Sequence, residues 1–176
     1  MKAGASQATT MGFSTLDGLV MSTRCGAIDP GVLLHLLQER KLSPNELADL
    51  LYERSGLLGV SGISGNMQTL LASKDAAATR AVDLFVYRVG REIGSLAAAI
   101  GGLDTLVFTA GIGEHAPVIR QRICETVGWL GVALDKELNA NNKELASTGD
   151  SRVDVLVIAV DAERAVAAEL LNFEAG

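Results

Sequence analysis

Residues 103–123, LDTLVFTAGIGEHAPVIRQRI, decide how the chain is expected to fold. Residues 105–109 form a short, mostly apolar run rich in β-branched and aromatic side chains, which predicts a buried strand. Residues 110–114 follow with two glycines, and we expect a loop in which these glycines adopt positive φ and leave room for a ligand. Pro117 then begins a segment whose apolar residues recur with a helical period.

A strand, a glycine loop and a helix N-terminus in succession direct backbone N–H groups and the positive end of a helix dipole at the loop. Such an arrangement favours phosphate and other anions. The loop lacks the lysine of a P-loop and the third glycine of a dinucleotide-binding fingerprint. These residues alone are therefore equally compatible with a nucleotide-binding loop and with a plain tight connection between strand and helix.

The composition predicts one soluble domain with an aliphatic core. Of the 176 residues, 48% are apolar and only 4% are aromatic. The net charge is −6 and basic clusters are lacking, so nucleic acid is not an expected partner. The longest apolar stretch, residues 93–100, is too short to span a membrane, and we expect a cytoplasmic protein without a membrane partner. Cys25 and Cys124 show no metal-binding spacing and are interpreted as small apolar side chains in a reducing compartment.

The first thirty residues are poor in regular patterns. Residues 1–10 are small and polar and are expected to be a poorly ordered lead-in. Residues 11–30 are rich in Gly, Ser and Thr around one cation, Arg24. Small residues around an arginine indicate a loop that lines a cleft, where the guanidinium would bind carboxylate or phosphate. A surface ion pair of Arg24 with Asp17 or Asp29 is the alternative, and composition alone favours it.

Helices are predicted between this loop and the central strand. Residues 31–41 repeat apolar side chains with a helical period. Ser43 and Glu46 form a capping box at the start of the next helix. Residues 57–68 are dense in glycine, which indicates close approach of the backbone to another element or to a ligand. A long helix over residues 76–100 has an apolar face that suits a core or a subunit interface.

A second apolar run, residues 153–160, predicts another buried strand, adjacent and parallel to the first because a helical crossover separates them. Residues 128–134 are expected to pack against this sheet, and residues 135–150 to form a polar surface excursion. The acids of residues 161–163 precede a last helix, residues 164–172. They complement that helix's dipole, or hold a cation at the carboxyl end of the strand; physics alone favours the first role.

Four segments together resemble the acetate kinase family of the sugar kinase, Hsp70 and actin superfamily. They are MGFSTLDGLVMSTRCGAIDP at residues 11–30, SGIS at 61–64, DTLVFTAGIGE at 104–114 and VLVIAVDAE at 155–163. The resemblance is to the C-terminal part of these longer proteins. It implies an α/β fold, a truncated actin-like ATPase (ribonuclease H-like) domain whose small sheet is flanked by several helices. Residues 11–176 would form its nucleotide-side domain.

The resemblance also implies roles for individual residues. Arg24 matches an arginine that contacts the transferring phosphoryl group, and Glu163 matches one member of an acidic pair that places Mg²⁺. The residues that match segments beside the nucleotide, ATP or ADP, are Gly111, Ile112, Gly113, Asn66, Met67 and Gln68.

Several positions depart from the family pattern. Asn66 and Gln68 stand where the family has Asp and Arg, so both charges of that triplet are lost. Ala162 stands at the first position of the acidic pair and leaves Glu163 alone, which puts Mg²⁺ binding in question. His115 follows the GIGE segment where Asn is usual.

Two functions follow from the resemblance. The first is an acetate kinase-type phosphotransferase that moves phosphate in line between ATP and a short-chain carboxylate, and that is inactive as this chain alone. The second is a non-catalytic remnant, or a partner-dependent half of a split propionate or butyrate kinase. We also expect a homodimer, with residues 76–100 as the contact, because neighbouring strands of the family's sheet are lacking and leave an open edge.

Overall fold

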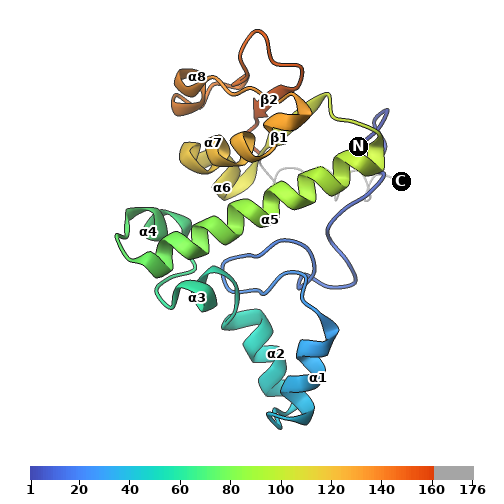
Figure 1. Cartoon of the computed structure of the whole chain (residues 1–176), viewed down its shortest axis with the longest axis vertical. Coiled ribbons are helices and arrows are strands. Elements are labelled where there is room, and N and C mark those ends of the chain that lie inside the picture. Colours follow the sequence, from blue (N-terminus) through green and yellow to red (C-terminus); the bar gives the residue numbers. More distant parts are fainter. Residues whose placement is uncertain (161–176) are drawn as a thin grey trace, which may run out of the picture.

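A long helix, α5 (Ala76–Ile100), runs through the middle of the computed structural model, which describes residues 1–160 (Figure 1). The Asp75 carboxylate caps its start by accepting a hydrogen bond from the Ala77 N–H, and Gly101 ends it with φ of 83°. The helix therefore has the bounds that its sequence pattern predicted. Its buried face consists of Ala78, Ala81, Val82, Phe85, Val86, Gly90 and Ala97.

The sheet has two strands within residues 1–160, β1 (Thr105–Phe108) and β2 (Asp154–Val157). They pair in parallel, with Thr105 opposite Asp154 and Phe108 opposite Val157, so the predicted βαβ arrangement is confirmed. Two isolated β-bridges lie beside this sheet: Val132 pairs with Val153, and Leu145 pairs with Leu156.

The chain between the two strands forms a helical layer against α5. It comprises α6 (Ala110–His115), α7 (Pro117–Thr126), the 3₁₀ turn η1 (Gly128–Leu130) and α8 (Lys136–Ala140). α7 packs on α5 and on α8, and its Ile119 and Ile123 belong to the core that also contains β2.

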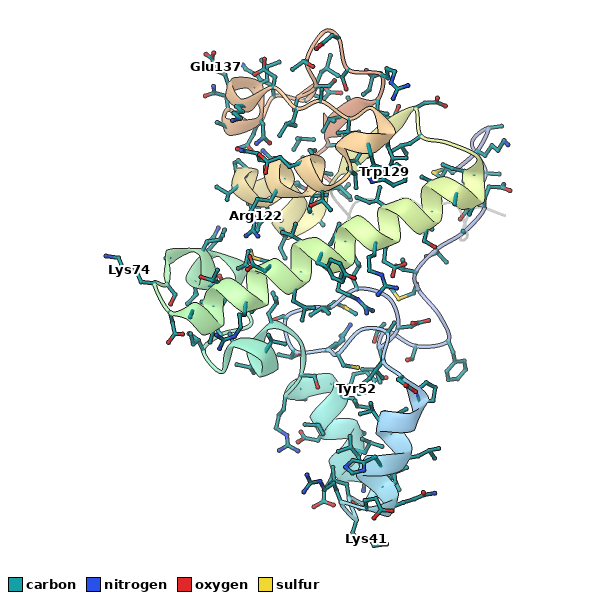
Figure 2. All side chains as sticks on the ribbon, in the orientation of Figure 1. Lys41, Tyr52, Lys74, Arg122, Trp129 and Glu137 are labelled. Carbon is teal, nitrogen blue, oxygen red and sulfur yellow. The ribbon has the colours of Figure 1, made fainter. Side chains whose placement is uncertain are left out.

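Two expectations for this region hold only in part: within residues 128–134, Val132 belongs to the core that contains β2 and Leu130 and Leu134 pack against it, but Trp129 departs from the expectation. Trp129 does not pack against the sheet: 70% of it is exposed, and its ring lies over α5 near Gly94 (Figure 2). Gly131, with φ of 98°, reverses the chain after η1 so that Val132 enters the core in its place. Residues 135–150 are not simply a surface excursion, because Ala146 and Asn139 are buried.

The remaining helices lie below α5 in Figure 1, except the helix of residues 67–72, which lies beside the start of α5. α1 (Pro30–Gln38) and α2 (Pro44–Glu53) pack on each other, and the predicted capping box of α2 is present. α3 (Gly56–Ser61) and α4 (Met67–Ala72) pack against α5. In residues 1–10, Lys2 and Ala5 form one backbone bridge; the poorly ordered lead-in remains untested. None of the helices in residues 1–160 has the length and apolarity needed to cross a bilayer.

Candidate functional site

The turn after β1 differs from the predicted glycine loop. Residues 110–115 form the short helix α6, and the positive φ of 57° falls on Ala110 instead of Gly111 or Gly113. The Glu114 carboxylate accepts a hydrogen bond from the Ala110 N–H at 2.7 Å and closes the helical turn. Gly113 packs closely on the end of β1, because a Cβ there would lie 3.3 Å from the carbonyl carbon of Phe108 and the backbone would have to shift slightly. Gly113 thus allows close packing against β1, and Gly111 leaves the space beside it open. Neither glycine adopts a left-handed backbone conformation.

A cavity of about 390 Å³ lies between the N-terminal end of α4 and α6; we call it the α4–α6 cavity. Five of the six residues that the sequence assigned to the nucleotide line it, and Gly113 lies behind them against β1. Its complete lining is Ser22, Leu57, Gly65, Asn66, Met67, Gln68, Gly111, Ile112, His115 and Ala116.

The lining of the α4–α6 cavity suits a flat ligand with polar edges. Leu57, Met67 and Ile112 provide apolar walls, and the amides of Asn66 and Gln68 provide donors and acceptors. No Asp, Glu, Lys or Arg is among the residues that line it. Its volume is at the lower end of the roughly 300–1,000 Å³ typical of small-molecule sites. A flat ring with polar edges fits this chemistry, and the lining contains no carboxylate, lysine or arginine that would meet a phosphate.

Arg24 lies on the loop of residues 21–26, which runs along the start of α3. The Leu57 N–H donates to the Met21 carbonyl at 2.8 Å and the Leu58 N–H donates to the Ser22 carbonyl at 3.0 Å. The loop thereby brings Ser22 into the α4–α6 cavity, whereas Arg24 is not among the lining residues. The surface ion pair that composition favoured for Arg24 is wrong: the ion pairs within residues 1–160 involve Arg54 and Arg122.

Two residues that the sequence analysis missed hold α6 in place. Arg120 on α7 is fully buried, and its Nη1 donates to the Gly113 and Glu114 carbonyls, both at 2.8 Å. The Glu114 carboxylate accepts a second hydrogen bond from the Val160 N–H at 3.1 Å and so joins the ends of the two strands. Arg120 looks like a solvated helix charge in the sequence, and no local signal marks it as buried.

The predicted metal residue, Glu163, and the rest of the acidic segment lie outside the described residues. In the part of the chain from residue 1 to 160, no group of three or more His, Cys, Asp or Glu side chains is arranged to hold a metal ion.

The two cysteines should differ sharply in reactivity. Cys124 is 3% exposed, and burial raises the pKa of its thiol to about 12, while Cys25 is only half-buried, with a thiol pKa that burial also raises. Because the thiolate is the reactive form, we expect a disulfide reagent at mildly alkaline pH to modify Cys25 and spare Cys124. Both should react in denaturant, and mass spectrometry assigns the sites. Labelling of Cys124 at the rate of Cys25 in the folded protein would contradict this.

A small parallel sheet covered by helices, with a cavity beside the turn after β1, defines an α/β protein with a candidate ligand site at the carboxyl end of a strand. The chain belongs to the acetokinase family, whose model matches residues 1–168. It is 57% identical over 162 residues to an acetate kinase of Rhodopseudomonas palustris and 47% identical over 173 residues to one of Rickettsia prowazekii.

Solved structures agree with this assignment. An acetate kinase of Porphyromonas gingivalis matches 93% of this chain with a TM-score of 0.86 and 32% identity. A propionate kinase of Francisella tularensis matches 86% with a TM-score of 0.81 and 35% identity. The predicted fold, an α/β domain of actin-like ATPase type with a small sheet and several flanking helices, is therefore confirmed.

The chain spans less than half the length of the proteins that it matches. The aligned part covers 91% of this chain and 41% of the Rhodopseudomonas relative, 98% and 45% for the Rickettsia relative, and 42% of the Porphyromonas structure.

Proposed function

We propose that this chain is the nucleotide-binding part, C-terminal in the family's order, of an acetate kinase-type phosphotransferase that moves a phosphoryl group between ATP and acetate. The observation that carries the proposal is the α4–α6 cavity. It unites residues 66–68 with Gly111 and Ile112, two segments far apart in sequence that were assigned to the nucleotide independently of the structure. Membership of the acetokinase family supports the phosphotransferase class.

In this proposal each part of the site has a separate task. The α4–α6 cavity holds the base, with its apolar walls against the ring faces and its amides at the ring edges. Arg24, on the loop that supplies Ser22 to the cavity, stabilises negative charge on the phosphoryl group as it transfers. Glu163 is the residue of this chain proposed to orient Mg²⁺, which would supply positive charge beside the phosphates when bound with the nucleotide.

A second candidate is a half that needs a partner to bind nucleotide tightly, within a propionate or butyrate kinase. The uncharged lining of the cavity favours it, because Asn66 and Gln68 supply no charge toward phosphate. One of the matched structures is a propionate kinase, and the described residues do not distinguish the carboxylates by size. Self-association through α5 remains part of both proposals.

The nucleotide proposal is tested by filling the cavity. A Cβ on Gly111 would meet no atom within 4 Å, its φ is not positive and Gly111 lines the cavity, so we expect the backbone to accept Gly111→Leu and the new side chain to occupy cavity space. Because the ligand and the new side chain compete for one volume, we expect ADP affinity to fall at least about tenfold with the unfolding midpoint unchanged. Isothermal titration calorimetry measures the affinity.

Gly149→Leu is the matched control, since a Cβ there also meets nothing within 4 Å and Gly149 does not line the cavity. It should bind ADP as the wild type does. Absence of ADP binding in the wild type, or equal binding by both variants, would overturn the nucleotide assignment.

A further inference from the structure

Arg120 is a buried cation whose hydrogen bonds all go to neutral oxygens. Besides the carbonyls of Gly113 and Glu114, its Nη2 donates to the Asn139 carbonyl and to the Asn142 side chain, both at 2.7 Å. Its Nε donates to the Asn139 side-chain oxygen at 2.7 Å. All three guanidinium nitrogens are thus engaged, and Arg120 takes part in neither of the two ion pairs within residues 1–160.

Burying this charge without a carboxylate partner lowers the stability of the fold, so stability does not explain why an arginine occupies this position. Burial lowers the pKa of the Arg120 guanidinium, which nevertheless remains protonated near neutral pH. Removing a cation from water carries a large desolvation penalty, and apolar residues of similar volume often serve stability as well or better. The geometry of the partners gives a different reason for an arginine: its planar fork can bind oxygens from separate segments at fixed angles.

The partners of Arg120 belong to two segments, at α6 and α8, that both pack on α7. Gly113 and Glu114 carry the last carbonyls of α6, and Asn139 and Asn142 lie at and just beyond the end of α8. Asn139 is 2% exposed and also donates from its side chain to the Pro117 carbonyl at 2.9 Å. The positive charge therefore meets the negative ends of two short helices at once, a favourable arrangement for a cation.

From these contacts we propose that Arg120 is a positioning residue for the α4–α6 cavity, with Asn139 and Asn142 as its supports. It clamps the carbonyls of α6 to α8, so that Gly111 and Ile112 stand at fixed positions on the cavity wall. Glu114 extends the clamp: its carbonyl is held by Arg120, while its carboxylate holds the Val160 N–H at the end of β2. Through these hydrogen bonds, the position of α8 fixes the position of the cavity wall and of Val160 after β2.

The expected effect of Arg120 on ADP affinity rests on the proposed nucleotide function. The hydrogen bonds by which Arg120 holds α6 do not depend on that function. Arg120→Met keeps a long apolar side chain and removes all five hydrogen bonds. In the full chain without ligand, we expect amide exchange at residues 114–116 to accelerate at least about tenfold, while the middle of α5 stays protected. ADP affinity should fall at least about tenfold as well, since one hydrogen bond to a charged group is already worth about that factor.

Three further variants separate positioning from general stability. Arg122→Met removes a partly exposed cation of the same helix, labelled in Figure 2, that pairs with Asp83 at 2.6 Å, and it should change neither readout by more than about twofold. Ile119→Val lowers stability from a fully buried site on the same helix and should leave ADP affinity intact. Asn142→Ala removes one bond only and should give a few-fold effect on both readouts; it replaces Arg120→Met if that variant does not fold.

Amide exchange tests the positioning role of Arg120, and ADP affinity also tests the proposed nucleotide site. Unchanged exchange at residues 114–116 in folded Arg120→Met and in Asn142→Ala would overturn the positioning role. So would a loss of ADP affinity in Ile119→Val as large as that in Arg120→Met. Faster exchange confined to residues 114–116 supports the clamp even if the wild type binds no ADP, and that result would count against the proposed nucleotide function only.

Discussion

The isolated chain is expected to show no measurable acetate kinase turnover. Phosphoryl transfer depends almost wholly on positioning and on charge stabilisation around the moving group. Within residues 1–160 this chain offers Arg24 and an uncharged cavity, and it spans less than half of its relatives' length. Loss of one well-placed donor costs a factor of roughly 10²–10³ in rate. Loss of several lowers the rate below detection, even though such losses are not additive.

A coupled assay of ADP release with acetate and Mg-ATP measures this turnover, with the Arg24→Ala variant run beside the wild type. Both should match the background rate. Turnover that clearly exceeds background in the wild type and vanishes in Arg24→Ala would show that this chain assembles a competent site by itself, and would also establish Arg24 as a catalytic residue.

The elements with strong local signals could be predicted from the sequence. Residues 76–100 carry a helical apolar period between Asp75 and Gly101, which are an N-cap and a C-cap, and the helix has those bounds. Thr105 and Asp154 lie in two short apolar runs separated by a helical crossover, which suffices to predict parallel pairing. The pairing of segment 66–68 with segment 111–112 in one cavity was reached through the family resemblance, since their spacing contains no such information.

What could not be predicted depends on contacts between distant residues. Ala110 carries the positive φ because Glu114 captures its N–H, and a pattern that assigns left-handed conformations to glycine misses this. Arg120 and Asn139 are polar residues of helices that look solvated in the sequence, yet they are buried because they satisfy each other across 19 positions. Only tertiary structure shows such mutual satisfaction.

Gly56→Ala should be among the most destabilising single substitutions in this chain. Gly56 has a φ of 61°, and a Cβ there would overlap the Met21 carbonyl oxygen and lie 2.9 Å from the carbonyl oxygens of Ser22 and Arg24. The left-handed backbone costs an alanine about 1–2 kcal/mol, and forcing the rigid backbone of the loop aside adds about 1–3 kcal/mol. We expect a loss of roughly 2–5 kcal/mol, which lowers the thermal midpoint by about 4–20 °C in a chain of this length.

Gly62→Ala separates the two contributions to this loss. Gly62 has almost the same φ, 64°, but a Cβ there would meet no atom within 4 Å, so its alanine variant pays the backbone term alone. Urea unfolding of both variants should therefore show the larger loss for Gly56→Ala. Cys25 lies in the loop that Gly56 contacts, and its N–H donates to the Leu51 carbonyl of α2. Displacement of this loop should expose the Cys25 thiol, so we expect Cys25 to react faster with a thiol reagent in Gly56→Ala and not in Gly62→Ala. Equal losses in the two variants, with unchanged Cys25 reactivity, would show that the loop carrying Arg24 is not held by this backbone contact.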